Sequence, residues 1–152
     1  GIGLVHLLYC DLRFSADNAV FTTSFSRRGL IAEHGLSWML PLIVGHANAC
    51  DLLLSARRVT AVEAKEMGLV NRLLPAAELA GFTYDYARDL AHNVSPRSMR
   101  VIKRQLYEVP FQSLADATID ANREMAMSVR SEDFREGVAH FIEKRPARFT
   151  GR

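Results

Sequence analysis

The chain has 152 residues, of which 49% are hydrophobic and 24% are charged, and its formal net charge at pH 7 is +2. This length and apolar content suffice for one domain with a buried core, and the near balance of charge indicates neither a nucleic acid nor an anionic membrane as a partner. No apolar run reaches the ~20 residues that a membrane-spanning helix needs, and no signal-peptide pattern is present.

Two cysteines, Cys10 and Cys50, lie in apolar runs without the spacing of a metal site. We therefore predict buried thiols, no bound metal and a cytoplasmic protein, because the cytoplasm keeps thiols reduced. The chain opens without an initiator Met and already within an apolar helical pattern. We expect a fragment whose missing N-terminal portion supplies partners for the residues present.

The first half of the chain alternates between predicted helices and strands. Gly1 and Gly3 precede an apolar helix that we expect to be buried on most sides, at a point where the backbone approaches another segment closely. Pro41 predicts a break or kink in its helix, and Leu52 to Leu54 are expected to fill a core. The predicted elements are a helix at 2–10, strands at 11–15 and 19–22 joined as a hairpin by a turn at 16–18, helices at 34–44 and 46–55, a helix capped by Thr60 and Glu63 and ended by Gly68, and a strand at 69–74.

After Pro75 the sequence predicts helices alone. Their wide apolar stripes indicate surfaces that pack on partners. An α/β first part, residues 1–75, followed by a helical region, residues 76–152, is therefore the expected organisation. The predicted helices are 78–92, a helix that follows the Ser95-Pro96 cap, a long helix capped by Ser113 with Asp116, and a last helix that starts at Ser131.

One stretch, residues 25–45, places Glu33 and His34 where a glycine-flanked turn meets an apolar helix. Near a helix N-terminus the backbone N–H groups lack intrahelical partners, and the helix dipole attracts negative charge. The residues alone leave two interpretations of Glu33 open. It is either a functional acid or a first-turn residue that complements the dipole.

Several short motifs are spaced along the chain. They are Gly1-x-Gly3 before an apolar helix, Cys10-Asp11, Gly29-Leu30, Leu40-Pro41-x-x-x-Gly45, Ala49-x-Asp-Leu-Leu-Leu-Ser55, Glu63-Ala64-x-x-x-Gly68-Leu69-Val70-Asn71, and Arg135-Glu136-Gly137-x-x-x-Phe141-x-Glu-Lys144-Arg145. Together they resemble the crotonase superfamily of enoyl-CoA hydratases and isomerases, over essentially the whole chain.

The resemblance implies the C-terminal part of a spiral of ββα units in residues 1–75, followed in residues 76–152 by a helical region that builds homotrimers, often paired into hexamers. It also implies acyl-CoA substrates and no covalently bound cofactor. The shared mechanism stabilises a thioester enolate with two backbone N–H groups. The resemblance places one of these N–H groups at Ile2 and the other upstream of residue 1. Because the 152-residue chain would then hold only half of the oxyanion hole, we expect it to have negligible activity by itself.

The sequence departs from the hydratases of this family at both catalytic glutamates. By motif alignment these fall at Val5 and Phe25, which cannot activate water. The segment from Gly29 to Gly35 is instead similar to the turn of the peroxisomal-type Δ3,Δ2-enoyl-CoA isomerases, whose glutamate matches Glu33. We therefore expect this chain to have the same isomerase activity, with Glu33 as the catalytic base. The Glu33 carboxylate should lie in an apolar pocket lined by residues such as Phe25, Leu36 and Trp38. The alternatives are a hydratase or thioester hydrolase that uses Glu33 and His34, or a catalytically silent CoA-binding protein.

Four further residues have weaker assignments. His34 is either a second acid–base group or a surface histidine, and His6 is expected to be a core histidine. Phe141 and Lys144 match family positions that hold the adenine and phosphates of CoA. Without the resemblance they would be an apolar-stripe residue and a helix C-terminal cation.

Overall fold

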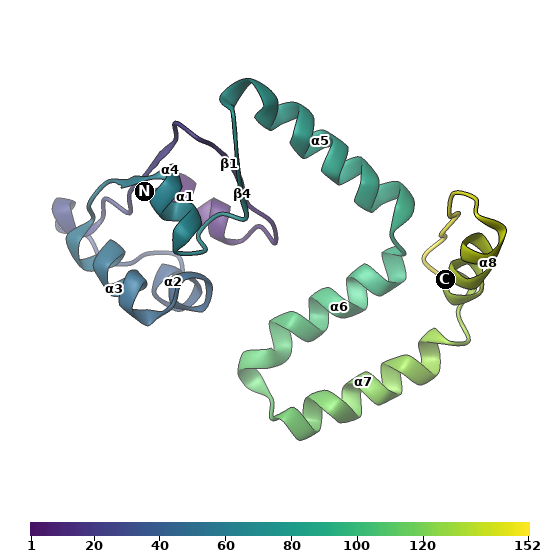
Figure 1. Cartoon of the computed structure of the whole chain (residues 1–152). Coiled ribbons are helices and arrows are strands. Elements are labelled where there is room, and N and C mark those ends of the chain that lie inside the picture. Colours follow the sequence, from purple (N-terminus) through teal and green to yellow (C-terminus); the bar gives the residue numbers. More distant parts are fainter. The chain divides into compact units, whose positions relative to one another are not determined.

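The computed structural model describes all 152 residues of the chain, which divide into two compact units, residues 1–83 and 84–152 (Figure 1). The first unit mixes helices with short strands. Its elements are α1 (Ile2–Leu8), β1 (Phe14–Ala16), β2 (Val20–Phe21), the 3-10 helix η1 (Ser26–Arg28), α2 (Leu36–Val44), α3 (His46–Ser55), β3 (Val59–Thr60), α4 (Ala61–Glu66), β4 (Arg72–Leu74) and the first residues of α5 (Ala76–Asn93).

The second unit is helical. After the rest of α5 it contains α6 (Pro96–Glu108), the 3-10 helix η2 (Val109–Phe111), α7 (Leu114–Ser128) and α8 (Glu132–Glu143). The expected helix caps are confirmed, because the hydroxyl of Ser95 accepts the amide of Ser98 and Ser131 does the same for Phe134. Ser113 and Asp116 form the full reciprocal capping box at the start of α7.

The strands pair with later segments of the chain. β1 pairs in parallel with β4, with Phe14 opposite Arg72, while β2 pairs antiparallel with β3, with Val20 opposite Thr60. The predicted hairpin is therefore wrong. The turn does form, since the amide of Ala19 donates to the carbonyl of Ala16, but an isolated two-stranded hairpin of this length has little stability of its own.

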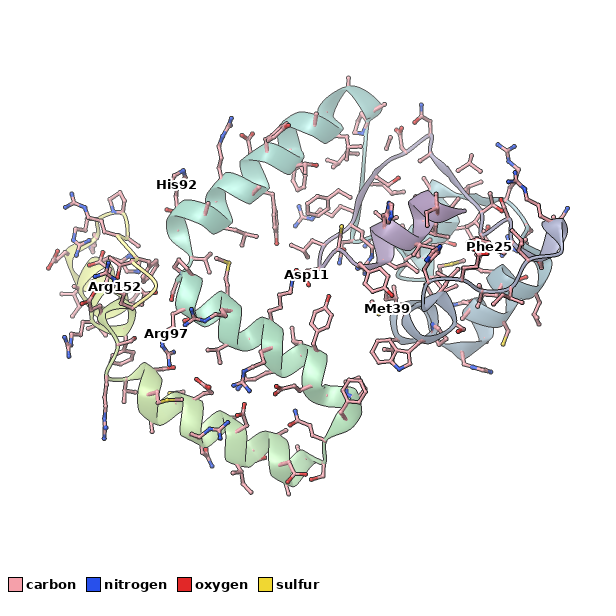
Figure 2. All side chains as sticks on the ribbon, turned by 180° about the vertical axis from the view of Figure 1, so that it is seen from behind. Asp11, Phe25, Met39, His92, Arg97 and Arg152 are labelled. Atoms are coloured by element: carbon pink, nitrogen blue, oxygen red, sulfur yellow. The ribbon has the colours of Figure 1, made fainter.

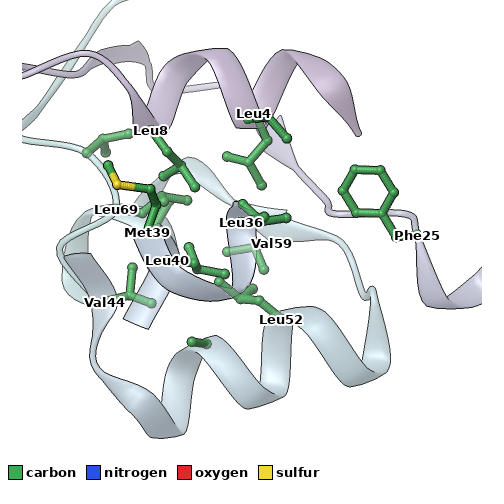
Figure 3. Packing of buried hydrophobic residues seen from close by; sticks show 14 residues of the cluster. Leu4, Leu8, Phe25, Leu36, Met39, Leu40, Val44, Leu52, Val59 and Leu69 are labelled. Atoms are coloured by element: carbon green, nitrogen blue, oxygen red, sulfur yellow. The ribbon is translucent and has the colours of Figure 1, made fainter. Parts of the chain in front are cut away.

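The apolar core of the chain lies in the first unit. Every buried hydrophobic residue falls between Leu4 and Val70, and α1, α2 and α3 supply most of them (Figure 3). α2 continues through Pro41 to Val44, so of the two predicted outcomes a break does not occur. On α3, Leu52 is 2% exposed but Leu54 is 78% exposed, which corrects the prediction that all three leucines fill the core.

Two other burial predictions are wrong. α1 buries one face, through Leu4, Val5 and Leu8, and His6 on another face is exposed. Cys10 is also exposed and Cys50 is only partly covered, although both are free thiols as expected. The apolar run did not imply burial on all sides, because the rest of this chain covers only one face of α1.

Polar contacts and exposed apolar faces characterise the second unit. α6 and α7 lie side by side, and the guanidinium of Arg104 on α6 pairs with Asp120 and Glu124 on α7 (Figure 1). Arg97, labelled in Figure 2, lies at the start of α6. Its guanidinium donates to the hydroxyl of Ser128 on α7. The buried residues of this unit are Ser95 and Asp133, both polar. The larger exposed apolar side chains of α6, α7 and α8 include Ile102, Leu106, Ile119, Met125, Phe134, Val138, Phe141 and Ile142.

No helix in the chain combines the length and apolar character that crossing a lipid bilayer requires.

Candidate active site

The start of α1 borders a cavity of about 360 Å³. Gly1 is the N-cap, and its amine donates to the carbonyl of Thr22 at 2.6 Å. The amide of Ile2, the first helical residue, makes no hydrogen bond within the chain, because no earlier turn supplies a carbonyl. An unpaired N–H donor therefore lies at a mostly apolar cavity. The lining residues are Gly1, Ile2, Gly3, Leu4, Leu7, Val20, Phe21 and Thr22.

The two glycines at this cavity have free space around them. A Cβ atom built on Gly1 or Gly3 would meet no atom within 4 Å. The expected close approach of another segment is therefore absent within this chain.

Glu33 lies in the turn that precedes α2. The next two residues are left-handed, with φ +54° at His34 and φ +73° at Gly35, and the carbonyl of Glu33 accepts the amide of Leu36. α2 consequently begins at Leu36 and not at the predicted residue 34, with Gly35 as its N-cap. No acidic residue lies in the first turn of α2, so the interpretation of Glu33 as a first-turn residue is wrong.

The carboxylate of Glu33 is only partly covered. Its side chain is 37% exposed, and its Oε2 lies 3.7 Å from Nε2 of His34, which is itself exposed. Two of the three residues expected to enclose it, Phe25 and Leu36, are buried in the core, and Trp38 is exposed. Within this chain the enclosing apolar pocket is therefore not formed, and Glu33 is not among the residues that line the cavity at Ile2.

The sequence model of the enoyl-CoA hydratase/isomerase family matches residues 1–152 of this chain. The chain belongs to that family. Among curated proteins, it is 33% identical to the 1,2-epoxyphenylacetyl-CoA isomerase of Escherichia coli and 34% identical to a probable enoyl-CoA hydratase of Rhodobacter capsulatus. Both matches cover all of this chain, but 58% and 59% of those proteins respectively.

Solved structures agree with this assignment. The chain matches a probable enoyl-CoA hydratase/isomerase from Mycobacterium abscessus with a TM-score of 0.96 and 34% identity, over 100% of this chain and 60% of that one. An enoyl-CoA hydratase from Geobacillus kaustophilus matches with a TM-score of 0.90 and 34% identity, over 99% and 57%. The α/β, crotonase-like fold is therefore confirmed, and the chain spans about three-fifths of the length of these relatives.

In this member of the enoyl-CoA hydratase/isomerase family, the two positions matched to the hydratase glutamates are buried. Val5 is 1% exposed and Phe25 is 7% exposed, and both belong to the apolar cluster shown in Figure 3. A water molecule at either position would have no polar side chain to hold it. Within this chain these two positions therefore cannot supply the paired carboxylates of a hydratase.

The residues expected to contact CoA end α8 in the second unit. Phe141 is 79% exposed, and Lys144 is the left-handed C-cap of the helix, with φ +54° and an exposed side chain. The neighbouring Arg145 is bound to Glu136 and Glu143, whereas Lys144 has no ion pair in the chain. An aromatic ring and an ammonium are thus both accessible to a nucleotide ligand at the end of this helix.

Sequence reasoning missed one residue of this region, Tyr9. It follows the last residue of α1, and its hydroxyl donates to the carbonyl of His34 at 2.8 Å. The available signal was a hydroxyl-bearing aromatic residue at the end of an otherwise apolar helix, because a tyrosine in such a position requires a polar partner or solvent for its O–H group.

Proposed function

We propose that this protein is an enoyl-CoA isomerase that converts a 3-enoyl-CoA into a 2-enoyl-CoA, with Glu33 as its single acid–base group. The observation that carries the proposal is the replacement of both hydratase carboxylates by the buried side chains of Val5 and Phe25. The turn before α2 nevertheless keeps a carboxylate, Glu33, that remains accessible. One relative is named as an isomerase of an acyl-CoA compound, which supports an isomerisation of a CoA thioester as the type of reaction.

The reaction needs one group that both removes and returns a proton. The Glu33 carboxylate takes a proton from C2 of the thioester, and the electron pair of that C–H bond delocalises through C3=C4 and the carbonyl as a dienolate. The same proton then returns to C4, which leaves the double bond between C2 and C3. No water is consumed, so a site without a pair of water-holding acids suits this reaction.

The amide of Ile2 is our proposed donor to the enolate oxygen. It lies at the first position of α1, where the N–H has no partner in the chain and the helix dipole adds positive potential. A preorganised donor at a developing oxyanion contributes about 3–4 kcal/mol of transition-state stabilisation. The second donor of the family's oxyanion hole is expected from outside residues 1–152.

The CoA portion of the substrate would contact Phe141 and Lys144. Their exposure at the end of α8 supports this assignment, since an aromatic face packs on adenine and an ammonium pairs with phosphate. We also propose a homotrimer or hexamer, because the second unit buries no apolar residue while its helices expose many. The two free thiols support a reducing, cytoplasmic location.

The test compares Glu33→Gln with the parent on a 3-enoyl-CoA and on a 2-enoyl-CoA, using the complete natural protein. We expect isomerisation by the parent and at least a 100-fold loss of kcat in the variant, because general acid–base catalysis contributes about 10²–10⁴-fold. The exposed Glu66→Gln on α4 is the matched control and should retain parental turnover. Parental kcat in Glu33→Gln would remove Glu33 from the mechanism.

The second candidate function is an enoyl-CoA hydratase, in which Glu33 and His34 together position water. Relatives carry that name, and the His34 imidazole lies 3.7 Å from the Glu33 carboxylate. Water addition to the 2-enoyl-CoA that is lost in Glu33→Gln would favour it, and release of free CoA would favour a thioester hydrolase. Tight acyl-CoA binding without turnover would indicate a silent binding protein.

A further inference from the structure

A hydrogen bond connects the end of α1 to the turn that carries Glu33. Tyr9 is the C-cap of α1, and its hydroxyl donates to the backbone carbonyl of His34 at 2.8 Å. The two residues are 25 positions apart in the chain, so this contact joins separate elements. It acts on the peptide group between His34 and Gly35, one residue after Glu33.

The turn needs such a restraint because its backbone is unfavourable. His34 has φ +54°, which a non-glycine residue rarely adopts, and Gly35 follows with φ +73°. Left-handed conformations of this kind persist when the surroundings hold them in place. If the His34 carbonyl were released, the turn could relax, and the side chain of Glu33 would move with it.

Tyr9 follows a helix, α1, that is anchored in the core of the first unit. The face of α1 that contains Leu4, Val5 and Leu8 is buried in the apolar core. Just beyond Tyr9, the carbonyl of Cys10 accepts a hydrogen bond from the guanidinium of Arg13 at 2.7 Å. That guanidinium also donates to the carbonyl of Leu69 at 2.8 Å, which ties the end of α1 to a distant segment of the same unit.

The Tyr9 hydroxyl also lies close to the backbone at Gly35. A Cβ atom built on Gly35 would lie 2.8 Å from the oxygen of Tyr9, closer than real Cβ contacts come. The hydroxyl therefore lies directly over the glycine. The positive φ of Gly35 favours glycine at this position, and the missing Cβ atom leaves room for the hydroxyl.

We propose that Tyr9 is a positioning residue that holds Glu33 at a set distance from the amide of Ile2. This inference rests on the proposed function, in which Glu33 is the base and Ile2 supplies the oxyanion donor. Both ends of α1 then serve the reaction, because Ile2 starts the helix and Tyr9 caps its other end. Tyr9 makes no contact with the substrate in this role. It acts through the turn.

The test is Tyr9→Phe, which removes the hydroxyl and keeps the ring. We expect kcat for isomerisation to fall about 10- to 100-fold while KM stays within about twofold, because misplacement of a catalytic group by about 1 Å costs rate and leaves substrate binding intact. The midpoint of thermal unfolding should stay unchanged. Tyr84→Phe is the matched control, since Tyr84 is exposed, has no hydrogen bond within the chain and should retain parental kinetics.

Glu33→Gln, measured in parallel, separates this inference from the proposed function. If Glu33→Gln is inactive and Tyr9→Phe keeps the parental kcat, the positioning role is overturned and the proposed function stands. If Tyr9→Phe lowers the thermal midpoint and impairs kcat and KM together, its role is structural and the inference fails. Parental kcat in Glu33→Gln refutes both.

Discussion

The hydroxyl of Ser95, at the start of α6, donates to the buried carboxylate of Asp133 in α8 at 2.5 Å, and so joins positions 38 residues apart. The other oxygen of Asp133 accepts the amides of Thr150 and Gly151. Burial raises the pKa of this carboxyl, but the hydrogen bonds from Ser95 and from the two amides outweigh burial, so its pKa lies below the ordinary value. Asp133 thus holds the C-terminal segment against α8 within the second unit.

Asp133→Ala should lower the free energy of unfolding by about 2–3 kcal/mol, because Ser95 and two backbone amides lose their acceptor. Urea unfolding followed by circular dichroism measures the change. Asp85→Ala on α5, which breaks an exposed pair with Arg88, is the control and should change the value by less than about 0.5 kcal/mol. Equal changes in the free energy of unfolding would show that the Asp133 hydrogen bonds stabilise the fold no more than an exposed ion pair does.

The carboxylate of Glu136 is paired with the guanidinium of Arg145 through two hydrogen bonds, and it also accepts the amide of Arg148. Hydrogen bonds from Arg145, reinforced by that amide, lower the pKa of Glu136 to about 2. Since the unfolded chain has a value of about 4.3, the pair stabilises the folded state fully above about pH 5 and loses this contribution as the pH falls toward 2.

An NMR titration of the side-chain carboxyl carbons should therefore give a midpoint near pH 2 for Glu136. Glu136→Gln should make stability less sensitive to acid between about pH 5 and pH 2, because its side chain binds no proton there. A midpoint near 4 in the folded protein would contradict the prediction.

Two leucines on α3 should differ strongly in their contribution to stability. Leu52 is buried in the core and Leu54 is exposed, although both belong to one apolar run. Leu52→Ala should cost about 2–5 kcal/mol by leaving a cavity, and Leu54→Ala less than about 0.5 kcal/mol. Urea midpoints of the two variants provide the comparison. A large effect of Leu54→Ala would mean that another surface covers this residue.

The role of the Ile2 amide can be tested with proline. Ile2→Pro removes the N–H group, and proline is tolerated at the first helical position because its fixed φ suits the helix start. We expect kcat for isomerisation to fall about 10²–10³-fold, as for the loss of one oxyanion donor. Ile2→Val keeps the N–H group and should keep parental kcat within a few-fold. Retained activity in Ile2→Pro would exclude this amide as a donor.

Local sequence signals predicted the helices well, because each cap acts over three or four neighbouring residues. Ser95, Ser113 and Ser131 begin their helices as expected. Strand pairing and burial were predicted poorly. Distant parts of the chain decide which segment pairs with the strand at Phe14. They also decide whether Leu54 faces the core.

The order of residues was enough to determine the family motifs, the helix caps, and the replacement of two hydratase acids by Val5 and Phe25. The tertiary structure decided that these two side chains are buried, that Glu33 precedes α2 outside its first turn, and that Tyr9 reaches across to that turn. The physical reason is the distance along the chain over which each kind of interaction acts. Capping and periodicity act along a few residues, whereas enclosure of a side chain and a hydrogen bond spanning 25 positions exist only once the chain has folded back on itself.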